Sequence, residues 1–165
     1  MTRRRTQEWL CWGPLADQPV SSLMHWPVAA VEDTDSLLEV SRTLADNEIG
    51  AVCVLHNGAL VGLVSERDLA ARLGSGPQTG DQPGDTTGEV SAGEVMSPQL
   101  VTVPPETPIL EAARIMHEAH VRHLPVVSEH VVAGMVSMRD LFDLFLDHAD
   151  RWPEVPGQRV RERRG

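Results

Sequence analysis

The sequence predicts a mixed α/β (α+β) fold made of two copies of one unit, each running strand, helix, strand, strand, helix. Three observations support this prediction. Shifting the chain by 72 residues aligns it with itself without a gap, pairing Met24 with Met96 and Val54 with Val126. Each copy ends in GxxSxRDL, at 62–69 and at 134–141. Within each copy, helical spacing of apolar residues gives way to short apolar runs typical of strands. Each unit has roughly 50 residues, so we expect the two to pack against each other.

The elements follow in the same order in both copies, with a strand expected first. Thr107 and Pro108 are typical of a helix N-cap and first position, and apolar residues from 109 to 119 then recur with a helical period. The matching helix opens at Asp35 and Ser36. Two apolar runs joined by a turn follow each helix, and Asn57-Gly58 in the first turn is a strong hairpin signal. A last helix is expected over 138–149.

The repeated GxxSxRDL stretch marks a junction between a strand and a helix, and it has two interpretations. Ser followed three residues later by Asp matches a capping box, in which hydroxyl and carboxylate satisfy free backbone amides. The same junction points amides and a positive dipole end outward, which favours phosphate binding. Both interpretations can hold at once.

Composition narrows the class of protein. The chain has 165 residues, 41% of them hydrophobic and 23% charged, as in an ordinary globular protein. Its net charge of −10 argues against general nucleic-acid binding, and its apolar runs are too short to span a membrane. Cys11 and Cys53 lack metal or redox spacing, and no nucleophile has an evident base. We expect a cytoplasmic protein that is not an enzyme.

The chain divides into five segments: an N-terminal arm (1–19), a first repeat (20–73), a Gly- and Pro-rich linker (74–90), a second repeat (91–146) and a C-terminal tail (147–165). The arm carries Trp9 and Trp12, whose partner the sequence does not reveal. The tail carries several arginines, which we interpret as a solvated segment.

The two GxxSxRD stretches, the Val121–Val127 segment VRHLPVV, the Val95-Met96-Ser97 opening and the ungapped repeat resemble a tandem pair of cystathionine-β-synthase (CBS) domains, a Bateman module. The resemblance covers about residues 20 to 146. It implies two repeats packed sheet to sheet about a pseudo-two-fold axis. It also implies a stand-alone regulatory, energy-sensing role, in which AMP, ADP, ATP or S-adenosylmethionine binds between the repeats and alters contacts with an unknown protein partner. No cofactor is required.

The resemblance also implies which residues bind the ligand. Asp68 and Asp140 would accept hydrogen bonds from ribose hydroxyls, and Ser65 and Ser137 with their helix-start amides would meet phosphate. One cleft would combine Ser137, Asp140, Arg122 and His123 with backbone near Ala29 and Ala30; the other would combine Ser65, Asp68, Gly50 and Ala51 with Thr102.

The two clefts are expected to differ in affinity. Arg122 and His123 in the second repeat correspond to Gly50 and Ala51 in the first, which carry no charge. Glu66 follows Ser65, whereas neutral Met138 follows Ser137, so a carboxylate would repel phosphate at the Asp68 cleft. We therefore expect the Asp140 cleft to bind nucleotide more tightly.

Other patterns leave alternatives open. His117, His120 and His123 form HxxHxxH, which could place two imidazoles on one helical face, although the third lies beyond the expected helix end. We predict no metal site there. A competing function is an interaction or nucleic-acid-associated protein with empty clefts and arginine-rich contact sites. The last helix has a broad apolar face that includes Leu141, Phe142, Phe145 and Leu146, which predicts a homodimer.

Overall fold

The computed structural model describes residues 17–74 and 90–149. Most of the predicted arm, linker and tail, with Trp9, Trp12 and Cys11, lies outside these residues. The helices and strands are, in chain order, η1 (Val20–Ser22), β1 (Ala30–Glu32), α2 (Leu37–Asp46), β2 (Ala51–His56), β3 (Ala59–Ser65), α3 (Glu66–Gly74), α4 (Ala92–Val95), α5 (Ile109–Ala119), β4 (His123–Ser128), β5 (Val131–Ser137) and α6 (Met138–Ala149).

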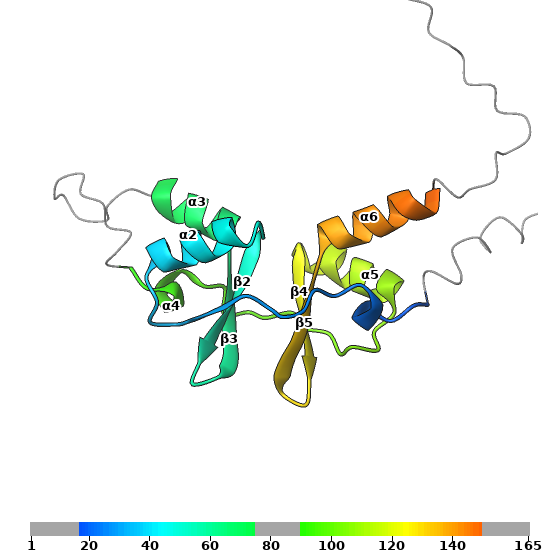
Figure 1. The fold of residues 1–165 in the computed structure, drawn as a ribbon, viewed down its shortest axis with the longest axis horizontal. Coiled ribbons are helices and arrows are strands. Elements are labelled where there is room, and N and C mark those ends of the chain that lie inside the picture. The colour runs from blue at the N-terminus through cyan, green and yellow to red at the C-terminus, as the bar shows by residue number, and fades with distance from the viewer. Residues whose placement is uncertain (1–16, 75–89, 150–165) are drawn as a thin grey trace, which may run out of the picture.

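Two small sheets stand side by side at the middle of the molecule, with α2, α3 and α4 flanking one sheet and α5 and α6 flanking the other (Figure 1). The first sheet has the order β1-β2-β3, with β1 parallel and β3 antiparallel to β2. The second contains the antiparallel pair β4-β5. The predicted mixed fold with two repeated units is therefore confirmed.

The opening strand differs between the repeats, which the sequence analysis did not predict. In the first repeat β1 pairs three residues with β2, including Val31 with Val54. In the second repeat the corresponding strand is reduced to a single bridge between Val103 and Val126. In the first repeat Asp33 N donates to Leu55 O and Cys53 N donates to Ala29 O. The corresponding residues of the second repeat are Pro105 and Pro125, which have no N–H to extend the ladder.

The helix starts agree with the capping signals in one repeat and differ by one residue in the other. Ser36 caps α2, and its side chain and that of Glu39 bond each other's backbone amides in a capping box. The N-cap of α5 is Pro108 instead of the predicted Thr107. Helix ends vary by a residue or two, so the difference is small.

The first residues of each repeat pack in the core of the other repeat. Val20 donates a backbone hydrogen bond to Thr107 O at 2.8 Å, and at the equivalent position Ala92 donates to Asp35 O at 2.7 Å. Val20 is buried in the core of the second repeat and Ala92 in that of the first. Between η1 and β1 the chain crosses from the α5 side to the β2 side (Figure 1). These matched exchanges relate the repeats by the predicted pseudo-two-fold axis and bury both apolar faces.

The apolar faces of the helices are narrower than the sequence suggested. Leu141 belongs to the core at 1% exposure, whereas Phe142 and Leu146 of α6 are exposed. Leu38 and Leu110, at equivalent positions of α2 and α5, are also exposed. Within residues 17–74 and 90–149, no helix is long and apolar enough to cross a membrane.

Candidate ligand cleft between the repeats

The two GxxSxRDL junctions are built alike. Asp140 Oδ2 accepts hydrogen bonds from Ser137 N and Ser137 Oγ, both at 2.7 Å, while Asp140 N lies 3.3 Å from Ser137 Oγ. Asp68 and Ser65 repeat this arrangement at 2.8, 2.6 and 3.4 Å. The capping interpretation is thus confirmed, with Asp in the role usually taken by Glu.

The glycine of each junction makes room for a methionine from the other repeat. A Cβ at Gly134 would lie 2.7 Å from Met24 Cγ, and one at Gly62 would lie 2.8 Å from Met96 Cγ. Beside these contacts, His25 pairs with Met135 and Ser97 pairs with Leu63 in isolated bridges. The repeated Met and Gly positions therefore form two equivalent contacts, in each of which the methionine of one repeat packs on the glycine of the other.

A cleft of about 1010 Å³ opens between the repeats, on the side where the segment before β1 crosses the molecule. This volume is at the upper end of the range usual for small-molecule sites. Its lining joins the start of α6 to the start of β2 and the end of α2. The residues are His25, Trp26, Pro27, Val28, Ala29, Ala30, Thr43, Asn47, Glu48, Ile49, Gly50, Ala51, Glu66, Arg122, His123, Met135, Ser137, Met138, Arg139, Asp140 and Asp143.

Asp140 is held from two sides within this cleft. Its side chain is 11% exposed, and Oδ1 lies 2.8 Å from Nε2 of His25 while Oδ2 holds Ser137. In the second repeat Ser97 stands at the position that corresponds to His25. A carboxylate oxygen accepts more than one hydrogen bond, so Oδ1 retains capacity for a ligand hydroxyl.

Charged side chains from both repeats act on the His123 ring. Burial lowers the pKa of His123, because the charged ring would lose its hydration. The negative charges of Asp140 and Glu66 oppose this shift, while Arg122 and Arg139 add to it. The missing side chain of Gly50 makes room for the ring, since a Cβ there would lie 3.1 Å from His123 Nε2.

The cleft brings together most of the predicted site residues and separates the rest. Its lining includes Ser137, Asp140, Arg122, His123, Ala29 and Ala30, which the sequence analysis grouped together. Gly50 and Ala51 also line it, although they were grouped with the other cleft. Ala51 pairs with Ser65 across β2 and β3, so it lies between the two junctions. Ser65, Asp68 and Thr102 do not line this cleft.

Two further features of the cleft differ from the sequence-based expectation. Glu66 lines the Asp140 cleft, whereas it was expected to repel phosphate at the Asp68 cleft. The amides of the α6 junction are largely used within the chain, because Ser137 N donates to Asp140, Met138 N to Arg122 O, and Asp140 N to Ser137 Oγ. The position of Glu66 therefore removes one of the two grounds for tighter phosphate binding in this cleft. The engaged amides do not distinguish the clefts, because Ser65 N and Glu66 N at the α3 junction are engaged in the same way.

Sequence reasoning did not identify His25 and Trp26 as cleft residues. Trp26 lines the cleft and is 74% exposed, so it offers an open aromatic face. Comparing His25 with its repeat counterpart Ser97 was the available signal, but the contact with Asp140 spans 115 positions of the chain. No local pattern predicts such a contact.

The histidine and cysteine patterns form no additional site within the described residues. Among them, no group of three or more His, Cys, Asp or Glu side chains is arranged to hold a metal ion. His120 caps α5 in the left-handed region at φ 56°, which ends the helical face shared with His117. Burial raises the pKa of the Cys53 thiol to about 12, so Cys53 is an unreactive core residue.

The comparisons with known proteins agree with this architecture. The CBS domain family model matches residues 20–75 and 92–147, and the chain therefore belongs to the CBS domain family. It is 29% identical over 122 residues to CBS domain-containing protein YhcV of Bacillus subtilis, covering 74% of this chain and 81% of that protein. It is also 29% identical over 112 residues to the mitochondrial CBS domain-containing protein CBSX3 of Arabidopsis thaliana, covering 65% of this chain and 51% of CBSX3.

Solved structures show the same fold. The CBS domain pair of protein MJ0100, in complex with 5′-methylthioadenosine and S-adenosyl-L-methionine, is similar in two structures. One has a TM-score of 0.69 and 21% identity and covers 79% of this chain and 97% of that chain. The other has a TM-score of 0.68 and 22% identity and covers 78% of this chain and 99% of that chain. At this identity the likeness concerns the fold. The family model that matches indicates no catalytic family.

Proposed function

We propose that the chain is a regulatory sensor module that binds an adenosyl ligand in the cleft between its repeats and thereby alters contacts with a protein partner. The observation that carries the proposal is the placement of Asp140. Its carboxylate is oriented by Ser137 and faces a cleft to which both repeats contribute residues. A ligand bound there would contact both repeats and bias their relative arrangement, which is how a binding event becomes a signal.

The cleft offers complementary surfaces for the parts of an adenosyl compound. The ionised carboxylate of Asp140 suits a pair of ribose hydroxyls, because it accepts charge-assisted hydrogen bonds. Trp26 and Val28 supply aromatic and apolar surface for a purine ring. The complex of MJ0100 with two adenosyl compounds supports this choice of ligand class. AMP, ADP, ATP and S-adenosylmethionine are the candidates.

Replacing Asp140 by Asn tests the proposal. Asn keeps the shape and the acceptor that caps α6, but it presents an amide donor toward the ligand hydroxyls. We expect Asp140→Asn to weaken adenosine binding at least about tenfold in calorimetry, since hydrogen bonds to charged groups contribute roughly 1.5–3 kcal/mol. Asp68→Asn changes the same cap in the other repeat and is the matched control. Equal affinity of wild type and Asp140→Asn would overturn the assignment.

A thermal-shift screen of the same compounds beside an RNA and DNA titration addresses the competing function. A ligand that binds the native state raises its stability by mass action. Salt-sensitive nucleic-acid binding without any adenosyl shift would favour the interaction protein, whose predicted arginine contacts lie outside the described residues.

The buried free thiol of Cys53 suits the reducing cytoplasm, where we propose that the module works. We also propose that it functions as a homodimer.

A further inference from the structure

The charge of the Asp140 cleft is unusual for a phosphate-binding site. The charged side chains in its lining are four carboxylates and two guanidiniums, namely Glu48, Glu66, Asp140, Asp143, Arg122 and Arg139. His123 adds no compensating charge at neutral pH, because its buried ring favours the neutral form. An arriving phosphate therefore meets more negative than positive side chains.

Glu66 holds a central place among these carboxylates. It begins α3 in the first repeat, yet its side chain extends into the space above Gly50, where a Cβ would lie 3.8 Å from Glu66 Oε2 and 3.1 Å from His123 Nε2. The equivalent residue of the second repeat is Met138, which is neutral. The carboxylate that begins α3 in the first repeat therefore lines the cleft beside Gly50.

Three backbone N–H groups at the start of α6, a position that normally attracts phosphate, are also engaged. Ser137 N donates to Asp140 Oδ2 at 2.7 Å, Met138 N to Arg122 O at 2.8 Å, and Asp140 N to Ser137 Oγ at 3.3 Å. A phosphate at this junction would have to displace bonds already made within the chain. This observation is independent of the side-chain charges and points the same way.

We infer that the Asp140 cleft selects adenosyl compounds without phosphate, carrying a neutral or cationic group at the 5′ position of the ribose. The inference rests on the proposed function and narrows its ligand class. The carboxylates that repel a phosphate attract a sulfonium or an ammonium group. Adenosine represents the neutral class, and S-adenosylmethionine, whose two cationic groups outnumber its one carboxylate, represents the cationic class.

Calorimetry on the wild-type chain with adenosine, S-adenosylmethionine and AMP decides the matter. We expect adenosine and S-adenosylmethionine each to bind at least about tenfold more tightly than AMP. Tighter binding of AMP than of adenosine would overturn this inference and leave the proposed function intact. Failure of all three compounds to bind would overturn both. The two failures are therefore distinguishable.

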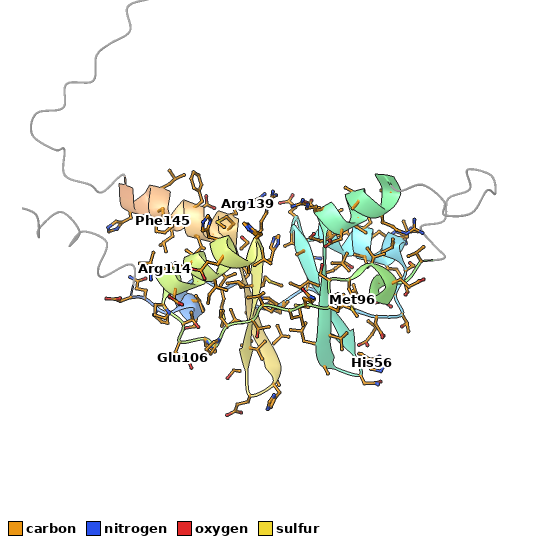
Figure 2. The ribbon with its side chains drawn as sticks, turned by 180° about the vertical axis from the view of Figure 1, so that it is seen from behind. His56, Met96, Glu106, Arg114, Arg139 and Phe145 are labelled. Atoms are coloured by element: carbon orange, nitrogen blue, oxygen red, sulfur yellow. The ribbon has the colours of Figure 1, made fainter. Side chains whose placement is uncertain are left out.

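Glu66→Met tests the residue to which we assign the selection, because it copies Met138 from the equivalent position. We expect this variant to bind AMP about tenfold more tightly than wild type, and to gain less affinity for uncharged adenosine. Glu106→Met makes the same charge change far from the cleft; Figure 2 shows Glu106 at the opposite end of the second repeat from Arg139. Equal AMP affinity in all three proteins would show that Glu66 does not set the preference.

Discussion

At the scale of single residues, the close contact of Gly134 with Met24 predicts a stability effect. A Cβ at position 134 would lie 2.7 Å from Met24 Cγ and 3.0 Å from Met24 Cβ, so the neighbouring chain must shift. We expect Gly134→Ala to lower the free energy of unfolding by about 1–3 kcal/mol, measured by urea denaturation. The double variant Met24→Ala, Gly134→Ala should regain part of the loss. Gly74→Ala, with open space around it, is the control. A fully stable Gly134→Ala would mean that Met24 moves aside at no cost.

His123 predicts a pH dependence of stability. Burial lowers its pKa in the folded chain, while in the unfolded chain the pKa returns to its ordinary value of 6.5. Between these two values the unfolded state binds more protons, so stability falls as pH drops below about 6.5 and levels off once the folded ring is also protonated. We expect His123→Gln to lose less stability than wild type between about pH 7.5 and pH 5.5. Exposed His117→Gln should behave as wild type. An NMR titration showing a raised pKa for His123 would contradict this prediction.

Sequence could predict the residues whose partners are near in the chain. Ser137 and Asp140 are three positions apart, so helical geometry alone specifies their capping bonds. His25 and Asp140 are 115 positions apart, and their contact depends on where the segment before β1 crosses the second repeat. The position of Glu66 at a helix start was predictable, but the cleft that it lines depends on how the two repeats pack against each other.

At the scale of elements, the two hairpins share one turn geometry but differ in how well their residues suit it. The turn of β2-β3 has Asn57 at φ 53° and Gly58 at φ 80°, whereas the turn of β4-β5 has Glu129 at φ 48° and His130 at φ 70°. Positive φ favours Asn and Gly at these positions. We expect His130→Gly to raise the free energy of unfolding by about 1 kcal/mol in urea denaturation. His56→Gly, at an exposed strand end, should bring no such gain. Unchanged stability of His130→Gly would show that the left-handed turn costs His130 nothing.

The elements themselves were largely predictable because their signals are local. The helical period, the Asn57-Gly58 turn and the Ser36 cap each act within a few residues. The opening strand of the second repeat was not predicted correctly, because Pro105 and Pro125 lack the N–H groups with which Asp33 and Cys53 extend the ladder of the first repeat. Where the repeats diverge, similarity between them is a weaker guide than the backbone chemistry of the divergent residue.

At the scale of the whole molecule, the first residues of each repeat pack in the core of the other repeat, which explains why both repeats line the cleft. Val20 packs in one core and Ala92 in the other, so neither repeat retains its complete core alone. The segment carrying His25 and Trp26 must then cross the molecule and becomes one wall of the cleft. The repeat in the sequence predicts two packed units, but the identity of the crossing residues at the cleft follows from the path of the chain.

An exposed apolar stripe on α6 points to a second copy of the chain. Met138, Phe142 and Leu146 recur at four-residue intervals and are 40%, 60% and 48% exposed. Leu141 and Phe145, which the sequence analysis counted with them, instead contribute to the second core or pack against it. The stripe is therefore narrower than predicted, but its members lie one turn apart on one face. Two copies related by a two-fold axis would each cover the other's stripe.

We therefore predict a homodimer that a single charge on this stripe disrupts. Phe142→Glu places a carboxylate at the centre of the stripe, and a two-fold axis brings the two copies of that charge together, which disfavours association. Light scattering at about 50 µM, well above a micromolar dissociation constant, should give a dimer for wild type and a monomer for Phe142→Glu. Val131→Glu adds the same charge at another exposed apolar side chain, 67% exposed on the β4-β5 hairpin, and should remain dimeric. A monomeric wild type at this concentration would contradict the prediction, and a dimer that survives Phe142→Glu would move the interface away from α6.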